Sequence, residues 1–219
     1  FAVINIDDGY GEWLFDSINI PSVAYAINKD ADVIASDIVL KEGKQCFMLN
    51  NTIPISMCMI GKFNISNALA SICVLKNIGL NDVEISNGFC QMKPVEGRFN
   101  SFMINDKLVV VDYAHTPDGL KNVITSCKEL AGQNKVISVF GCGGNREIQK
   151  RKIMGEISST LADYTFITSD NPRFEKREDI AKDIESGMKN NNYQTELDRS
   201  VAIKKAIQFA EVGDVVLIA

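Results

Sequence analysis

Asp170, Asn171, Pro172 and Arg173 place a carboxylate, an amide and a guanidinium within four consecutive residues. An amide donates and accepts hydrogen bonds, and a guanidinium can hold a carboxylate through two parallel hydrogen bonds. Pro172 restricts its own φ to about −65° and stiffens the segment. The cluster suits a zwitterionic ligand that carries both carboxylate and ammonium groups. Because Asp, Asn and Pro are also ordinary turn residues, the tetrapeptide taken alone favours a simple strand-to-helix turn.

A glycine-rich segment, FGCGGNR at residues 140–146, precedes this cluster. Glycines let backbone N–H groups approach an anion, and Arg146 adds a second guanidinium. The spacing is not G-x-G-x-x-G, and no ribose-binding acid follows at the distance typical of that motif. The segment is therefore a weak dinucleotide signature, and we expect a structural role for Cys142 between its glycines.

A third segment, VVVDYAHTP at residues 109–117, runs from an apolar strand into Asp112, His115 and a proline suited to the start of a helix. Asp112 could accept hydrogen bonds from ribose hydroxyls. His115 could contact phosphate or cap the turn, and a lone histidine is more often structural. Arg98 could reach a nucleotide from the linker PVEGRF, although a surface salt bridge is the commoner role of an arginine.

Asn64 and Asn67 lie one helical turn apart near the start of a predicted helix. Two amides placed in this way can read a ring such as adenine, which presents hydrogen-bond donors and acceptors. On their own they favour an N-cap asparagine followed by a polar helix residue.

The second half of the chain alternates strands with helices. This alternation, with right-handed crossovers, predicts an α/β fold with a mostly parallel, doubly wound sheet, and the loops that follow its strands would form the site. The predicted strands cover residues 108–111, 136–140, 164–168, 193–196 and 215–218. The predicted helices begin near Pro117 and cover residues 149–161, 178–189 and 201–210.

The first half has a different pattern of predicted elements, in which short β-like runs are followed by two helices. Apolar residues 2–6 come first, and residues 23–27, 33–40, 45–49 and 53–59 then read as strands. The helices cover about 65–75, ending at Gly79, and 82–92. We expect a hinge at Pro94–Asn100 and two domains, residues 1–98 and 99–219.

Composition excludes several classes of protein. The net charge is −5 without a basic stripe, which argues against nucleic acid and an anionic membrane surface as partners. No apolar stretch approaches the length of a membrane span. Six scattered cysteines without a CxxC pair indicate reduced thiols in a cytoplasmic protein. A single histidine rules out a multi-histidine metal site within this chain.

Taken in order, segments across the whole chain resemble the Mur ligase family. DYAHTPD, FGCGGNR and DNPR together are highly specific for it. The resembling segments are VINIDD, GKFNISNALA, PVEGRF, VVVDYAHTPDGL, VFGCGGNRE, KRKIMGEI, ADYTFITSDNPR and GDVVLIA. The resemblance implies the latter part of a central α/β ATPase domain followed by a C-terminal Rossmann-like domain.

The resemblance also implies an activity, namely ATP-dependent amide-bond formation in peptidoglycan precursor synthesis. The branch with DNPR adds meso-2,6-diaminopimelate to UDP-MurNAc-L-Ala-D-Glu through an acyl phosphate, with ATP and Mg²⁺. The implied partners are these small molecules, and the full-length protein is expected to be a monomer. The residues implied at the nucleotide are Asn64, Asn67, Arg98, Asp112 and His115. Those implied at diaminopimelate are Arg146, Asp170, Asn171, Pro172 and Arg173.

The sequence departs from the family pattern in what it lacks. The phosphate-binding G-x-x-G-K-[ST] loop, the metal-binding acid and histidine, and the modified lysine have no match, and the Gly-Lys-Gly-His-Glu segment would follow Ala219. We therefore expect no catalytic or metal-binding residue here, and a fragment that is inactive alone. The alternatives are a non-catalytic amino-acid-binding remnant, the L-lysine-adding homologue and a folylpolyglutamate synthase. Arg173 argues against lysine, which lacks the second carboxylate that a guanidinium would hold.

Overall fold

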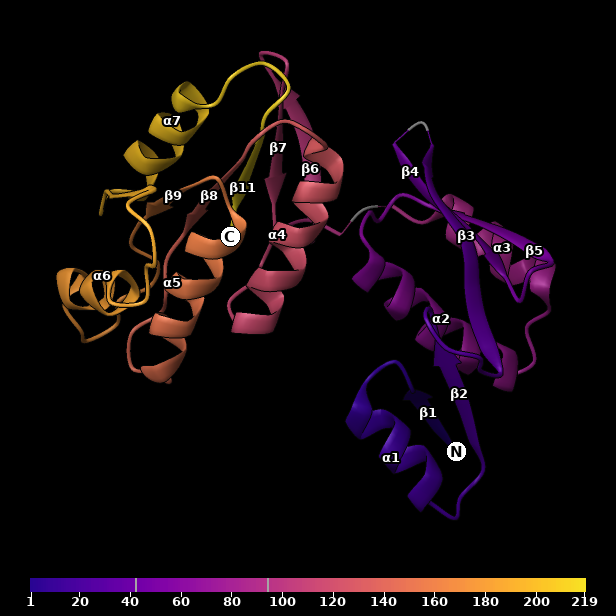
Figure 1. Ribbon diagram of the computed structural model, residues 1–219. Coiled ribbons are helices and arrows are strands. Elements are labelled where there is room, and N and C mark those ends of the chain that lie inside the picture. Colours follow the sequence, from indigo (N-terminus) through magenta and orange to yellow (C-terminus); the bar gives the residue numbers. More distant parts are fainter. Residues whose placement is uncertain (42, 94) are drawn as a thin grey trace. The chain divides into compact units, whose positions relative to one another are not determined.

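The computed structural model describes residues 1–41, 43–93 and 95–219. The chain divides into two compact units, Phe1–Pro94 and Val95–Ala219. Figure 1 shows the helices and strands of each unit. The hinge predicted at Pro94–Asn100 begins at a residue outside the described part of the chain, and Asn100 opens a strand.

A five-stranded sheet forms the first unit, in the order β1-β2-β3-β4-β5. The pairs β1–β2 and β2–β3 are parallel, whereas β3–β4 and β4–β5 are antiparallel. The sequence predicted the last four of these strands and marked the first only as an apolar run, and it did not predict this change of direction. The strands are β1 (Ala2–Asn5), β2 (Ser22–Ala26), β3 (Val33–Lys41), β4 (Lys44–Leu49) and β5 (Ile53–Met57).

Three helices lie in the described part of the first unit, and the sequence predicted the second and third. The helices are α1 (Gly9–Ser17), α2 (Lys62–Asn77) and α3 (Asp82–Gln91). The unpredicted α1 begins where the Asp8 carboxylate accepts the N–H groups of Tyr10 at 2.9 Å and Gly11 at 3.1 Å. As predicted, Gly79 follows the end of α2, and its φ of +100° suits a residue without a side chain.

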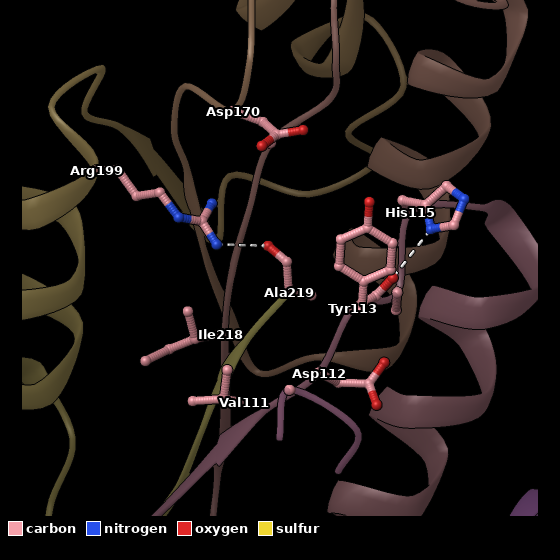
Figure 2. A pocket seen from close by; sticks show the side chains of 11 residues that line it. Val111, Asp112, Tyr113, His115, Asp170, Arg199, Ile218 and Ala219 are labelled. Atoms are coloured by element: carbon pink, nitrogen blue, oxygen red, sulfur yellow. Dashed lines mark hydrogen bonds between the residues drawn. The ribbon is translucent and has the colours of Figure 1, made fainter. Parts of the chain in front are cut away.

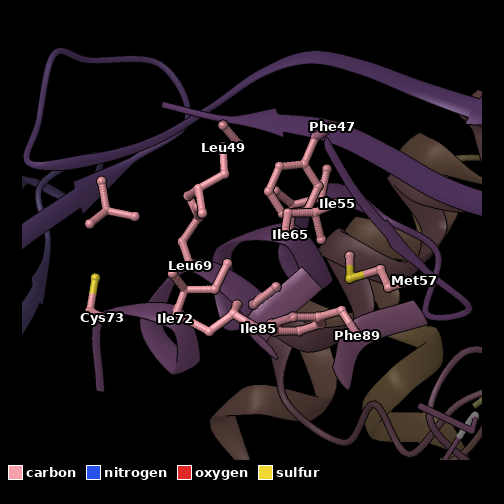
Figure 3. Packing of buried hydrophobic residues seen from close by; sticks show 13 residues of the cluster. Phe47, Leu49, Ile55, Met57, Ile65, Leu69, Ile72, Cys73, Ile85 and Phe89 are labelled. Atoms are coloured by element: carbon pink, nitrogen blue, oxygen red, sulfur yellow. The ribbon is translucent and has the colours of Figure 1, made fainter. Parts of the chain in front are cut away.

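Buried side chains from β4, β5, α2 and α3 form the core of the first unit, as Figure 3 shows. Fully burying a large aliphatic or aromatic side chain stabilises a fold by about 1.5–3 kcal/mol. This packing fixes α2 on the sheet and so sets the direction of Asn64 and Asn67 at its start. The labelled core residues include Phe47, Leu49, Ile55, Ile65, Leu69, Ile72, Ile85 and Phe89.

A six-stranded sheet forms the second unit, in the order β10-β9-β8-β11-β7-β6. Every neighbouring pair is parallel except β6–β7, so the predicted mostly parallel sheet is confirmed. The strands are β6 (Asn100–Ile104), β7 (Lys107–Val111), β8 (Val136–Phe140), β9 (Tyr164–Ile167), β10 (Tyr193–Thr195) and β11 (Val215–Ile218).

Helices cover both faces of this sheet. The last helix packs one face, where Ala202 and Ala206 meet Val109, Val139 and Val216. The helices α4 and α5 pack against the other face, and α6 packs against α5 (Figure 1). The helices are α4 (Pro117–Ala131), α5 (Gln149–Leu161), α6 (Arg177–Glu185) and α7 (Arg199–Phe209). The sheet is therefore doubly wound, as predicted.

The sequence did not predict β6, the edge strand of the second unit. It pairs antiparallel with β7 across a two-residue turn that links Ile104 to Lys107. Both turn residues, Asn105 and Asp106, have positive φ, at +48° and +58°. Asn and Asp tolerate this conformation, and such a turn matches the twist of a hairpin. The Asn-Asp pair between β-like runs was the signal that could have revealed the hairpin.

The strand β11 lies between β8 and β7, although it is the last strand in sequence. The order along the sheet therefore reverses at β8–β11–β7. Ligands of open α/β sheets bind beyond the carboxyl ends of strands at such a reversal. None of the helices in the described residues combines the length and the apolar composition needed to cross a bilayer.

Candidate functional site

A pocket of about 280 Å³ opens at the carboxyl ends of β7, β8, β9 and β11. Figure 2 shows Arg199 on one side of it and Tyr113 with His115 on the other. Three residues predicted from the sequence, Asp112, His115 and Asp170, contribute to its lining. The other lining residues are Gly97, Val111, Tyr113, Ala114, Gly141, Arg199, Ile218 and Ala219.

Asp112 follows β7 directly and is tied into the edge of the sheet. Its N–H donates to the carbonyl of Ile218 at 3.0 Å. Its carboxylate accepts the N–H of Phe99 at 2.8 Å. Burial raises the pKa of Asp112, while the Phe99 N–H and the nearby Arg98 oppose that rise. The side chain is thus an oriented carboxylate at the pocket wall, which suits the acceptance of hydroxyl hydrogen bonds.

The raised pKa of Asp112 predicts a pH-dependent effect of Asp112→Asn. A folded-state pKa above the unfolded value means that the group favours folding at low pH and that this contribution is lost as pH rises. The asparagine removes the partly buried charge and can still accept the Phe99 N–H. We expect Asp112→Asn to raise the melting temperature at about pH 7, with the gain fading towards about pH 3. Calorimetric melting over that range checks this, and a lower melting temperature at neutral pH would contradict it.

Tyr113 and His115 line the side of the pocket that faces Arg199 (Figure 2), and Arg98 lies against the Tyr113 ring. The guanidinium of Arg98 lies 5.1 Å from the centroid of the Tyr113 ring, a cation–π distance. Nδ1 of His115 lies 3.0 Å from the carbonyl of Tyr113. Because a carbonyl only accepts, Nδ1 carries a proton, and Nε2 points elsewhere. Lys150 on α5 donates to the His115 carbonyl at 2.8 Å and steadies this loop.

Arg199 is a pocket residue that the sequence reasoning missed. It is the first residue of α7, and its Nη2 donates to the carbonyl of Ala219 at 3.0 Å (Figure 2). Its Nη1 is buried without a hydrogen-bond partner in the described residues. In sequence Arg199 follows the N-cap Asp198 and looks like any polar residue of a first helical turn. No local signal separates it from an ordinary solvated side chain.

The glycine-rich loop and the DNPR loop lie against each other. The N–H of Gly144 donates to the carbonyl of Asn171 at 2.8 Å. The guanidinium Nη1 of Arg173 donates to the carbonyl of Gly144 at 2.6 Å. A Cβ on Gly144 would lie 1.9 Å from the carbonyl oxygen of Pro172, so only glycine allows this approach. The Gly144 N–H is therefore used in a hydrogen bond to the DNPR loop, whereas the sequence suggested that such N–H groups would bind an anion.

Arg173 has a φ of +50°, and its N–H donates to the side-chain oxygen of Asn171 at 3.2 Å. The DNPR segment is thus a turn, as its composition suggested. Arg146 is exposed on the neighbouring loop. Among residues 95–219, the lining of the pocket includes Asp170 but not Arg98, Arg146, Asn171, Pro172 or Arg173.

Asn64 and Asn67 lie in the first unit, one turn apart on α2 as predicted. The side-chain amide of Asn64 is buried and donates to the carbonyl of Ile60 at 2.8 Å. The oxygen of the same amide accepts from Asn67 Nδ2 at 3.3 Å. Asn67 is the exposed member of the pair and borders an apolar pocket of about 360 Å³ with Met59 and Met92. Asn64 is therefore an anchor for Asn67.

Cys142 has the structural role expected from the sequence. It is 3% exposed, and burial raises the pKa of its thiol to about 11. Its Sγ lies 3.7 Å from the sulfur of Met154 on α5. Within residues 1–41, 43–93 and 95–219, no group of three or more His, Cys, Asp or Glu side chains could hold a metal ion.

A doubly wound sheet with a pocket at the carboxyl ends of its strands is the arrangement in which open α/β proteins bind ligands. Residues 97–219 match the Mur ligase glutamate ligase domain, and residues 1–75 match the Mur ligase middle domain. The chain belongs to the Mur ligase family. The resemblance seen in the sequence motifs is thereby confirmed.

Comparison with individual proteins shows which Mur ligases this chain is similar to. The chain is 40% identical over 226 residues to the UDP-N-acetylmuramoyl-L-alanyl-D-glutamate–2,6-diaminopimelate ligase of Syntrophomonas wolfei, covering 100% of this chain and 46% of that protein. A solved structure of a ligase with the same name is 28% identical, with a TM-score of 0.62, over 99% of this chain and 47% of that one. The Thermotoga maritima MurF ligase, solved with ADP, has a TM-score of 0.73 over 99% of this chain and 48% of that one, and at 18% identity it shares the fold. The chain spans about half the length of the relatives it matches.

Proposed function

We propose that the protein containing this chain is an ATP-dependent ligase that joins meso-diaminopimelate to UDP-MurNAc-L-Ala-D-Glu. One observation carries the proposal: the DNPR loop is held against a glycine-rich loop at the carboxyl ends of the strands, in a chain 40% identical to a ligase of that name. Residues 1–98 form part of its central ATP-binding domain, and residues 99–219 form part of its C-terminal domain.

The amino-acid substrate binds at the paired loops in this proposal. Asp170 accepts hydrogen bonds from an ammonium group, and Asn171 and Pro172 hold the turn that presents it. Arg146 and Arg173 hold the carboxylates, which suit a planar guanidinium. Diaminopimelate carries one carboxylate more than lysine, so the second guanidinium favours diaminopimelate.

Each unit, taken by itself, contributes residues that we assign to the nucleotide. Asp112 accepts from the ribose hydroxyls, and Arg98 and His115 contribute positive or hydrogen-bonding groups nearby. In the first unit Asn67, held by Asn64, reads the edge of adenine, and the apolar pocket beside Asn67 suits a flat ring. The support for this assignment is the placement of Asp112 and His115 on one pocket and of the two asparagines on one helix.

The proposed cofactors are ATP and Mg²⁺. ATP supplies the phosphoryl group that activates the glutamyl γ-carboxylate. The residues of this chain bind the incoming amino acid and aim its amine at that carboxylate. Their contribution to rate is mainly orientation, because a reactant held in line avoids the entropic cost of a bimolecular encounter.

The test is a ligation assay with the full-length protein. UDP-MurNAc-L-Ala-D-Glu and ATP are supplied with meso-diaminopimelate or L-lysine, while ADP release and the mass of the tripeptide are measured. We expect the diaminopimelate product, with kcat/KM about 10- to 150-fold above that for lysine. A preference for lysine would contradict the substrate assignment. Tight diaminopimelate binding without ADP release would instead indicate a non-catalytic binding protein.

A further inference from the structure

Arg151 on α5 is an arginine buried within the second unit. Its side chain is 1% exposed, and it takes part in no wall of the pocket. Its guanidinium holds Glu175 through two parallel hydrogen bonds, Nη1 to Oε2 at 2.8 Å and Nη2 to Oε1 at 2.9 Å. Nη1 also donates to Asp183 Oδ2 at 2.9 Å. One buried cation thus gathers two carboxylates from different segments.

The partners of Arg151 lead directly to both loops of the amino-acid site. Nη2 lies 3.4 Å from the carbonyl of Gly143 in the glycine-rich loop. Glu175 also accepts the N–H of Asn145 in that loop. The N–H of Glu175 donates to the carbonyl of Pro172 at 3.0 Å and so closes the DNPR turn. The Arg151 guanidinium therefore contacts the glycine-rich loop directly and is linked to the DNPR loop through Glu175.

Close packing of α5 and α6 brings Asp183 to Arg151. A Cβ on Gly155 would lie 2.1 Å from the carbonyl oxygen of Ile184, and one on Gly187 would lie 1.9 Å from that of Lys152. Both positions need glycine for the two segments to approach so closely. The second carboxylate is thereby fixed beside the guanidinium by the backbone itself.

The Arg151 side chain is buried, whereas those of Glu175 and Asp183 are partly exposed. Removing charges from water costs free energy that their attraction offsets only with good geometry, and well-packed apolar residues often stabilise a core as well. The cluster also leaves Arg151 Nε buried without a hydrogen bond in the described residues. The parallel chelate fixes Glu175 in one orientation, and this geometric control is what an apolar core would not supply.

We propose that Arg151 is a positioning residue of the amino-acid site, which sets the conformation of Gly143–Asn145 and Asp170–Arg173 through Glu175. The proposal rests on the proposed function, because it names these loops as the diaminopimelate site. Arg151 itself touches no substrate. Supporting residues of this kind hold binding groups within a fraction of an ångström, which determines affinity.

Kinetics of the full-length protein test the proposal with a matched pair of variants. Arg151→Met is expected to raise KM for diaminopimelate about 10- to 100-fold while KM for ATP stays unchanged. Arg151→Lys keeps the charge but cannot chelate, so we expect an intermediate KM. Arg177→Ala removes an exposed arginine at the start of α6 and is the control, with KM close to the wild type. Equal increases in KM for both substrates, or a defect in Arg177→Ala as large as that in Arg151→Met, would overturn the proposal.

If Arg151→Met fails to fold, amide hydrogen exchange in a second variant, Glu175→Gln, tests the proposal instead. Glu175→Gln keeps the size of the side chain and removes the charge that orients it. We expect faster exchange at the amides of Gly144, Asn145 and Glu175, and unchanged exchange at Asp112, whose N–H bonds to Ile218 in the sheet. Unchanged exchange in the loops, or faster exchange throughout the unit, would overturn the proposal. If the wild type ligates no diaminopimelate, the proposed function fails, and this exchange experiment still decides whether Arg151 and Glu175 position the loops.

Discussion

An Arg173→Ala variant of the full-length protein is expected to use meso-diaminopimelate with a kcat/KM about 10- to 150-fold below that of the wild type. A hydrogen-bonded charge pair contributes about 1.5–3 kcal/mol, and alanine offers no replacement. The bond from Nη1 to the Gly144 carbonyl fixes the guanidinium at the loop pair and leaves its remaining N–H donors for a ligand. Steady-state ADP release with diaminopimelate and with lysine measures the change, and selectivity between the two should fall.

Two further variants test whether the effect of Arg173→Ala comes from the loss of a substrate contact. Arg173→Lys keeps a positive charge without the planar fork, so its kcat/KM should lie between those of the wild type and Arg173→Ala. Arg177→Ala removes an exposed arginine at the start of α6 and should leave the kinetics unchanged. The assignment of Arg173 to the second carboxylate is wrong if diaminopimelate and lysine lose activity equally, or if Arg177→Ala shows the same loss.

A Phe47→Ala variant is expected to destabilise the first unit by about 3–5 kcal/mol. The ring is 2% exposed and belongs to the cluster that holds α2 on the sheet (Figure 3). Truncation removes its apolar contacts and leaves a cavity, because the surrounding strands and helices relax only in part. Urea unfolding and hydrogen exchange of the α2 amides report the change.

Val39→Ala is the control for Phe47→Ala. Val39 lies in the same sheet but is 52% exposed, so its truncation should change stability by less than about 0.5 kcal/mol. If Phe47→Ala unfolded at the same urea concentration as Val39→Ala, the ring would not be part of a tightly packed core.

Strong local patterns made much of the fold predictable. The strand Val215–Ile218 is a continuous apolar run, and the strand Val136–Phe140 is apolar except for Ser138. The helix Gln149–Leu161 follows a glycine-rich turn, and all three elements occur with the predicted bounds. The two elements that were not predicted, α1 and β6, have weaker sequence patterns. Helix α1 has only nine residues, and two of the first three, Gly9 and Gly11, are glycines, which disfavour a helix. Strand β6 is an edge strand whose pairing depends on the turn that follows it.

The residues of the candidate site also fall into those that were predicted from the sequence and those that were not. Asp112, His115 and Asp170 were predicted because each follows a strand, and the carboxyl ends of parallel strands meet at one edge. Arg199 reaches the same pocket from the start of α7 and Arg151 reaches the loops from within α5. Those contacts depend on how distant helices pack on the sheet. A single sequence does not contain that information in any local spacing.

The position of β11 has a consequence for the synthesis of the protein. Its Val215 pairs with Leu108 on one side and with Val136 on the other, so the strand that joins the two halves of the sheet is translated after both of them. Until it leaves the ribosome, β7 and β8 each have an unpaired edge that can pair with another nascent chain. Closing such a long loop also slows folding. Aggregation during translation is therefore a hazard inherent in this strand order, and chaperones that shield strand edges would act in the interval before β11 is made.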